Sequence, residues 1–355
     1  MDLEGAEELS PRREVLGGGQ KSEISVDRNL IDTYDSQVDS ALRPSLLSEF
    51  IGQEELKTQL GVVLGAAGSR GEPPDHLLFA GPPGLGKTSL AFIVAEELGR
   101  GIRVTSGPAL GRVGDLAALL SDLSQGDVLF IDEIHRLPRA VEELLYVAME
   151  DFRLDVVIGK GPGARTLRLE IPRFTLVGAT TRSGMVSAPL RDRFGFSYRL
   201  DYYSDEELVK VVKRSSQLMN LELERDAAAE IASRSRGTPR LANRHLRRVR
   251  DYAEVEGIAG VDRVAAVEAL ELFGVDRLGL DKVDLEILRV LCDQFTGKAV
   301  GLSSIAVSVH EDPGTLEEVY EPFLIQRGLI IRTPRGRLAT ERAYDHLGLP
   351  YSGVL

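Results

Sequence analysis

The sequence of 355 residues contains no tryptophan and only one cysteine. It also lacks an apolar run of about 18 residues, which a membrane-spanning helix requires, so we expect no transmembrane segment and no membrane partner. The single cysteine, Cys292, cannot form a disulfide within the chain, and its apolar surroundings favour core packing. The N-terminal residues do not contain the apolar stretch of a secretion signal. We therefore expect a protein of the reducing cytoplasm.

Aromatic residues are scarce at 6%, whereas hydrophobic residues make up 43%, which is typical of a helix-rich α/β protein. The net charge of −12 argues at first against nucleic acid as a partner. However, residues 1–40 hold ten acids and four bases, a balance of −6 that is half of the total. Seven arginines and no acid lie in residues 234–250, and five arginines with one acid lie in residues 327–342. Basic patches therefore remain within an acidic protein.

The sequence pattern changes three times along the chain, which predicts four segments. Residues 1–35 are charge-rich and without periodicity, as expected of a disordered acidic tail. In residues 36–203, short apolar runs alternate with helical patterns, which indicates an α/β domain with a parallel sheet covered on both faces. Residues 204–275 show helix after helix, as in a compact bundle. Residues 276–355 show three short helices and a turn-rich strand pair, the pattern of a winged-helix domain.

The individual elements follow from hydrophobic periodicity. The expected strands of the α/β domain are 76–80, 127–131, 174–179 and 197–203. The expected helices of the last two domains are 205–219, 226–236, 241–256, 261–273, 283–295, 302–310 and 316–327.

Residues 153–173 predict a β-hairpin within the α/β domain. Two alternating segments, LDVVI and TLRLEI, flank the turn sequence GKGPG. Such a hairpin can be a connection that merely pairs with itself, or a projection that docks a partner. The residues alone favour neither alternative.

Residues 81–88, GPPGLGKT, form a phosphate-binding loop of the G-x4-G-K-[ST] type. An apolar strand precedes the loop and a helix follows it, which is the context that the motif requires. Glycines let backbone N–H groups converge on phosphate oxygens, and the helix adds its positive end. Lys87 would reach the β- and γ-phosphates, and the Thr88 hydroxyl would bind Mg²⁺.

A second motif, DVLFIDE, ends in Asp132 and Glu133 at the carboxyl edge of a predicted strand. Asp132 is suited to hold Mg²⁺ through water, and Glu133 to polarise the water that attacks ATP. Thr181, at the end of the next strand, could contact the γ-phosphate or this water, although threonines also simply end strands. Together the motifs predict ATP hydrolysis with ATP and Mg²⁺ as ligands.

From about Ala41 onward, the sequence resembles the RuvB family of AAA+ ATPases, which drive branch migration of Holliday junctions in bacteria. Eight blocks in the family's order carry the resemblance: LRPSLLSEFIGQ (42–53), GPPGLGKT (81–88), LFIDEIHRL (129–137), LLYVAMEDF (144–152), GATTR (178–182), PLRDRFG (189–195), RGTPRLANR (236–244) and RTPRGRLAT (332–340). The resemblance implies an AAA+ P-loop domain, a helical lid domain and a C-terminal winged-helix domain.

The resemblance also implies which residues surround the nucleotide. They are Leu42, Arg43, Gly84, Gly86, Lys87, Thr88, Ser89, Glu150, Asp151, Phe152, Thr181, Arg193, Tyr203 and Arg240. The residues alone allow plainer alternatives for some of them. Leu42 and Arg43 could be an ordinary domain entry, residues 150–152 an acidic helix end, and Tyr203 a buried aromatic side chain at a hinge.

Two arginines of the set have distinct roles in the family. Arg193 matches the arginine finger that such rings project into the ATP site of the neighbouring subunit, where it would stabilise charge on the γ-phosphate. Arg191 competes for this role, and a surface ion pair is the plainer alternative for either. Arg240 resembles the sensor arginine of the lid, for which Arg236 is the rival.

The turn that contains Arg332 and Arg337 lies where the wing of a winged helix would project. Both arginines match the DNA-contact positions of the family, although such a cluster is often only a solvated loop. Arginines on a turn reach phosphates without reading bases, as a motor that must pass any sequence requires. The scarcity of nearby aromatic residues favours duplex over single-stranded DNA.

The resemblance therefore implies a homo-hexameric ring around duplex DNA at four-way junctions. A RuvA-like junction-binding protein would dock on the hairpin 153–173, and a RuvC-type resolvase could join the complex. One alternative is a clamp-loader-like ATPase, which would not normally carry a winged helix. Another is an ATP-dependent transcription regulator with 316–327 as its recognition helix. Three acids on that helix, Glu317, Glu318 and Glu321, weaken the last alternative because they would face a polyanion.

Overall fold

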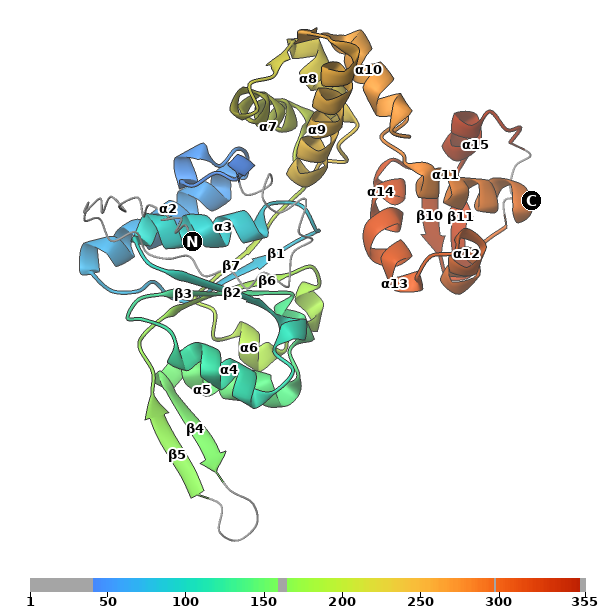
Figure 1. Ribbon diagram of the computed structural model, residues 1–355. Helices are drawn as coiled ribbons and strands as arrows, with labels where there is room; N and C mark the ends of the chain where they lie inside the picture. The colour runs from blue at the N-terminus through green and yellow to red at the C-terminus, as the bar shows by residue number, and fades with distance from the viewer. Residues whose placement is uncertain (1–40, 159–164, 297, 352–355) are drawn as a thin grey trace, which may run out of the picture.

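The computed structural model describes residues 41–158, 165–296 and 298–351. The expected acidic tail and the turn sequence of the hairpin at residues 159–163 lie outside these ranges. No helix within the described ranges combines the length and the apolar character that crossing a membrane would require. Figure 1 shows an α/β domain, a helical lid and a winged-helix module that follow one another along the chain.

Five parallel strands form the central sheet of the α/β domain in the order β2-β3-β6-β1-β7. Their bounds are β1 Leu77–Ala80, β2 Ile102–Ser106, β3 Val128–Asp132, β6 Thr175–Thr180 and β7 Phe196–Arg199. The four predicted strands are confirmed, but β7 ends four residues before the predicted limit. Strand β2 was not predicted, because it lies at the edge of the sheet and is buried at only two of its five positions.

Helices cover both faces of this sheet (Figure 1). The helices are α2 Glu54–Arg70 and α3 Lys87–Leu98 on one face, and α4 Val113–Ser121, α5 Arg139–Asp151 and α6 Ala188–Arg191 on the other. Alternate residues of β1 point to opposite faces, so Leu77 and Phe79 join one buried cluster and Leu78 joins the other. The connections contain short 3₁₀ turns, namely η1 Leu47–Glu49, η2 Gly107–Ala109, η3 Ile134–Arg136 and η5 Ser183–Met185.

The predicted hairpin is confirmed. It consists of the antiparallel strands β4, Arg153–Ile158, and β5, Arg165–Glu170. Figure 1 shows the hairpin projecting away from the central sheet, beyond α4 and α5. Its strands pair with each other and do not join the five-stranded sheet. The hairpin is therefore a separate arm of the α/β domain.

The lid is a bundle of four helices, as predicted. They are α7 Asp205–Leu218, α8 Arg225–Ser233, α9 Pro239–Glu256 and α10 Arg263–Leu272, with the short parallel strands β8 Glu222–Leu223 and β9 Gly260–Val261 between them. Helix α8 ends earlier than predicted because Arg236 and Gly237 adopt left-handed backbone angles, with φ of 53° and 68°. Helix α9 begins at Pro239, since proline suits the first helical turn.

The last module has its own buried core, separate from those of the α/β domain and the lid. Its elements are α11 Lys282–Arg289 with the π-helical extension η6 Val290–Gln294, α12 Leu302–Val309, α13 Pro313–Thr315, the π-helical η7 Leu316–Tyr320, α14 Glu321–Gln326, β10 Ile330–Thr333, β11 Gly336–Ala339 and α15 Glu341–Leu347. This arrangement is a winged helix, with α15 as an additional helix. Cys292 packs in its core, where burial raises the pKa of the thiol to about 11.

Candidate active site

The phosphate-binding loop connects the end of β1 to the start of α3. Gly84 and Gly86 have φ values of 82° and 98°, which favour glycine. The packing is also tight: a Cβ on Gly84 would lie 3.1 Å from Cβ of Arg240, and one on Gly86 would lie 3.1 Å from the ring of Phe50, so either neighbour would have to shift. The loop therefore leaves the N-terminus of α3 open to an anion.

Lys87 begins α3 and is buried under the loop. Its ammonium donates hydrogen bonds to the carbonyl oxygens of Gly81 and Pro82, both at 2.8 Å. Burial lowers the pKa of Lys87, while the nearby carboxylates of Asp132 and Glu133 act in the opposite direction. The charged amine thus lies inside the turn of backbone that would surround the phosphates.

Replacement of Lys87 with alanine is expected to weaken ATP binding by roughly 10²–10⁴-fold. The reason is that the two hydrogen bonds expected from the Lys87 ammonium to the β- and γ-phosphates, each worth about 1.5–3 kcal/mol, are lost. Isothermal titration with ATP measures the effect. Lys282→Ala is the matched control, because Lys282 is a highly exposed lysine of the winged-helix module. Tight ATP binding by Lys87→Ala would contradict the assignment of the loop.

The strand order places the acidic pair beside this loop. Strand β6 separates β3 from β1, so the ends of β3 and β6 meet the loop at one edge of the sheet. Asp132 ends β3, and burial raises the pKa of its carboxyl group. Glu133 has a left-handed φ of 46°, and its carboxylate accepts a hydrogen bond of 3.0 Å from the hydroxyl of Thr181 at the end of β6. The same carboxylate lies 3.2 Å from His135, whose pKa is lowered by burial.

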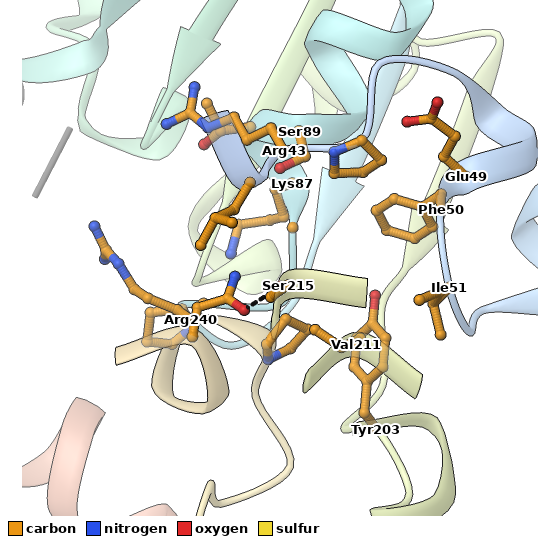
Figure 2. A pocket seen from close by; sticks show the side chains of 18 of the residues that line it. Arg43, Glu49, Phe50, Ile51, Lys87, Ser89, Tyr203, Val211, Ser215 and Arg240 are labelled. Carbon is orange, nitrogen blue, oxygen red and sulfur yellow. Dashed lines mark hydrogen bonds between the residues drawn. The ribbon is translucent and has the colours of Figure 1, made fainter. Parts of the chain in front are cut away.

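Asp132, Glu133 and Thr181 face a cavity of about 270 Å³. It lies between the α/β domain and the lid, and Figure 2 shows side chains from both parts around it. Twelve of the predicted residues line it: Leu42, Arg43, Gly84, Gly86, Lys87, Thr88, Ser89, Asp132, Glu133, Thr181, Tyr203 and Arg240. Segments far apart in the sequence are therefore brought together in one site.

The lid contributes Arg240 to the cavity from the first turn of α9 (Figure 2). Its backbone N–H donates to the carbonyl oxygen of Gly84 at 3.3 Å, so the helix touches the phosphate-binding loop directly. Tyr203 lines the cavity at the start of the lid and is also buried at the hinge, where its backbone N–H donates to Gly237. Both sequence-based interpretations of Tyr203 therefore match part of its surroundings.

Several residues of the cavity wall were not predicted from the sequence. Phe50 and Ile51 supply an apolar side from the segment before α2, and Val211 supplies another from α7 (Figure 2). Arg214 follows Val211 on α7 and donates to the backbone oxygen of Leu42 at 2.8 Å. The helical spacing gave a signal for this pair, because residues three apart, such as Val211 and Arg214, lie on one face of a helix.

Arg193 and residues 150–152 lie outside this cavity. The guanidinium of Arg193 lies 3.1 Å from the carboxylate of Glu150 and 4.6 Å from the ring centroid of Tyr146. The ring of Phe152 packs against His76, next to the start of β1, which is the opposite end of the strand from the phosphate-binding loop. The expectation that residues 150–152 lie beside the nucleotide therefore does not hold within one subunit.

The two alternative arginines, Arg191 for the finger and Arg236 for the sensor, have other partners in the structure. Arg191 donates to the carbonyl oxygens of Ser183 and Val186 in the loop that precedes it. Arg236 does not line the cavity, and its side chain bonds to Gly279 and to acids of the winged-helix module. Of the two lid candidates, Arg240 is the one at the cavity.

The two predicted DNA-binding arginines face each other across the wing. Arg332 on β10 pairs with Arg337 on β11, and both donate to Glu321, which is 4% exposed. Burial by itself would raise the pKa of Glu321, but the hydrogen bonds from the two arginines outweigh it and hold this pKa below its usual value. Of the three acids that weaken the recognition-helix alternative, Glu321 is therefore turned toward the wing arginines, whereas Glu317 and Glu318 are exposed.

Comparison with known families gives matches along nearly the whole described chain. Residues 42–200 match the model of the Holliday junction DNA helicase RuvB P-loop domain. Residues 203–276 match the RuvB AAA lid domain, and residues 277–348 match the RuvB C-terminal winged helix domain.

Individual relatives extend this similarity. The chain is 56% identical to the Holliday junction branch migration complex subunit RuvB of Corynebacterium glutamicum, over 98% of this chain and 95% of the relative. It is 58% identical to the protein of the same name from Nocardia farcinica, over 89% and 88% of the two chains. Among solved structures, the Thermotoga maritima RuvB Holliday junction branch migration motor is 50% identical, with a TM-score of 0.80 over 87% of this chain and 99% of that chain.

Proposed function

This chain belongs to the RuvB family, and from that premise we propose that it is an ATP-driven motor for branch migration of Holliday junctions. One observation carries the proposal. A single cavity joins the phosphate-binding loop and Glu133 to Arg240 of the lid, in a chain that also carries a winged helix. Hydrolysis in such a cavity can change the position of the lid and of the module attached to it.

In the proposed reaction, water attacks the γ-phosphorus and the bond to ADP breaks. Lys87 and the N-terminus of α3 hold the phosphates, and Glu133 accepts the proton of the attacking water. Thr88 and Asp132 offer oxygen ligands, which Mg²⁺ prefers, and the ion would neutralise charge on the β- and γ-phosphates. Thr181 donates a hydrogen bond to Oε2 of Glu133, so it orients the carboxylate while the other oxygen can accept from the attacking water.

We also propose a homo-hexameric ring in which Arg193 reaches the ATP of the next subunit. Its location outside the cavity of its own subunit supports this role. Arg193 must then leave Glu150 and Tyr146 when it engages a neighbouring γ-phosphate. Glu150 contacts Arg193 directly, so any contact of this segment with nucleotide would also be with that of the neighbour.

The remaining parts of the proposal concern partners. Arg332 and Arg337 of the wing would contact phosphates of duplex DNA at four-way junctions without reading sequence. The hairpin 153–173 would dock a RuvA-like protein, and a RuvC-type resolvase would act in the same complex in the cytoplasm. The proposed division is a tail (1–35), an ATPase domain (36–203), a lid (204–275) and a DNA-binding module (276–355).

The matched domains and the named relatives all point to branch migration. They do not favour a clamp-loader-like ATPase or a transcription regulator. The winged-helix match, which covers residues 277–348, is a module that a clamp loader would not normally carry.

A synthetic four-way junction with four heterologous end sequences tests the function. We expect the protein, together with a RuvA-type partner, to convert the junction to duplex products only when ATP and Mg²⁺ are present. A non-hydrolysable ATP analogue is the control. Products that form without hydrolysis would contradict a motor, and footprints confined to one sequence within random duplexes would support a regulator instead.

A further inference from the structure

The turn between α8 and α9 touches both the phosphate-binding loop and the winged-helix module. On one side, Arg240 bonds through its backbone to Gly84, as described above. On the other side, Arg236 extends to the module. The left-handed backbone of Arg236 and Gly237 makes the sharp turn that separates the two side chains. Only three residues lie between the arginine at the module and the one at the cavity.

The guanidinium of Arg236 makes three hydrogen bonds to the segment that begins the module. Its Nε donates to the carbonyl oxygen of Gly279 at 2.9 Å, and its Nη2 donates to Asp281 at 3.1 Å and to Asp284 at 2.5 Å. The guanidinium also lies 4.6 Å from the ring centroid of Phe323 on α14. This side chain is 10% exposed and that of Asp284 is fully buried.

Further contacts surround Arg236 where the lid meets the winged-helix module, a place that we call the joint. Arg327, directly after α14, donates to the backbone oxygen of Ser233 at 2.8 Å and lies 5.2 Å from the ring centroid of Phe323. Arg234 donates to the carbonyl oxygen of Val275 at 3.1 Å. A Cβ on Gly279 would lie 2.6 Å from the backbone oxygen of Arg234, so only glycine allows this approach. The lid and the module are therefore in direct backbone contact.

The connecting segment is itself closed by hydrogen bonds. The backbone of Asp276 bonds to that of Leu280 at 3.0 Å, and the Asp276 carboxylate accepts from the backbone N–H of Leu278 and of Leu280 at 2.8 Å. His346 of α15 lies 2.6 Å from the same carboxylate. Domains joined by exposed linkers usually move independently, whereas a connection held in this way restricts such motion.

We propose that Arg236 is the positioning residue that fixes the winged-helix module to the lid, so that ATP-dependent movement of the lid carries the DNA-binding wing with it. The inference rests on the proposed function, because it assumes that the lid responds to ATP and that the wing holds DNA. Arg236 touches neither ligand. Its role is to transmit displacement from Arg240 and the phosphate-binding loop to the module.

The chemistry of the joint suits this role. A buried arginine stays charged and binds several acceptors at fixed angles, which lysine cannot do. Burial raises the pKa of Asp284 to about 7, and the charge of Arg236 acts against this rise and favours the carboxylate. An ion pair between Arg182 and Glu318 also joins the module to the α/β domain, but about two fifths of each side chain is exposed. Exposed pairs contribute little, so the module is held to the lid more firmly than to the sheet.

Arg236→Ala in the full-length chain tests the proposal. We expect ATP affinity, basal ATP hydrolysis and nucleotide-free DNA affinity to change by less than about twofold, because Arg236 lies outside both sites. The effect of a non-hydrolysable ATP analogue on duplex affinity should be largely lost. Such coupling between sites is typically about 5–150-fold, and DNA should lose its effect on ATP affinity equally. Branch migration should fall by at least about fivefold, in line with the coupling that is lost.

Two further variants keep the test decisive. Arg263→Ala removes another lid arginine, which is 67% exposed and paired with Glu230, and should leave the coupling intact. Arg236→Lys keeps a positive charge beside Asp284 but loses the fork of donors, so it should fold and show intermediate coupling. It replaces Arg236→Ala if thermal unfolding shows that the alanine variant is not folded.

Unchanged coupling and migration in the folded Arg236 variants would overturn the inference. Loss of ATP binding itself would also overturn it, because Arg236 would then act at the nucleotide. The wild-type chain separates these results from failure of the proposed function: if it does not migrate junctions, the function fails, and if both it and Arg236→Ala migrate them equally, only the joint fails.

Discussion

Replacement of Arg193 with alanine is expected to lower steady-state ATP turnover of the assembled protein by roughly 10³–10⁵-fold while leaving ATP affinity nearly unchanged. The reason is geometric: Arg193 lies outside the cavity of its own subunit, so it does not hold the ground-state nucleotide there. Its guanidinium would act only when charge develops on the γ-phosphate of the neighbour. A coupled assay of ADP release and a titration with ATP measure the two quantities.

A mixture of subunits then tests whether the finger acts between subunits. Arg193→Ala subunits keep Glu133, and Glu133→Gln subunits keep Arg193, so mixed rings contain some complete sites. Titrating one variant into the other should restore part of the activity. Arg139→Ala is the matched control, since Arg139 lies on α5 and its side chain is 92% exposed. Absence of recovery at every ratio would exclude a finger that acts between subunits.

The parts of the fold that the sequence predicted correctly are those with a strong local signal. Strands β1, β3 and β6 are buried on both faces of the sheet, and they therefore appear as continuous apolar runs. Strand β2 is half-exposed, so its sequence IRVTS carries no such run. The end of β7 was predicted four residues too late because the apolar pattern continues into the hinge.

The residues of the candidate site also differ in whether a local sequence signal predicts them. Lys87 and Glu133 belong to motifs whose spacing is fixed by a loop or a strand, and the sequence places them without the fold. Phe50 and Val211 reach the cavity only because α7 and the segment before α2 pack against each other there. Apolar residues of this kind look the same whether they line a cavity or fill a core, so their position depends on tertiary packing.

The residues alone did not show which arginine side chain faces the cavity. Arg236 and Arg240 lie four residues apart in one basic segment, and nothing in that spacing says which one faces the nucleotide. The left-handed turn at Arg236 and Gly237 decides it, because it ends α8 before Arg236 and lets α9 begin at Pro239. The same limit applies to Glu321, which faces the wing arginines rather than solvent.

Replacement of Glu133 with glutamine is expected to slow ATP hydrolysis by about 10²–10⁴-fold and to leave ATP bound. The amide has nearly the shape of the carboxylate and can still accept a hydrogen bond from Thr181, but it cannot take a proton from water. Single-turnover hydrolysis with radiolabelled ATP measures the chemical step, and filter binding measures retained nucleotide.

An exposed acid on α5 provides the control for this variant. Glu143→Gln changes an acid of α5 whose side chain is 60% exposed and which pairs with Arg139, so hydrolysis should remain normal. Normal turnover by Glu133→Gln would move the base elsewhere. Asp132 is a poor replacement, because its Oδ1 already accepts the backbone N–H of Glu133 at 2.9 Å and its carboxylate is the proposed ligand of Mg²⁺. Glu133 is therefore the residue on which the proposed hydrolysis depends.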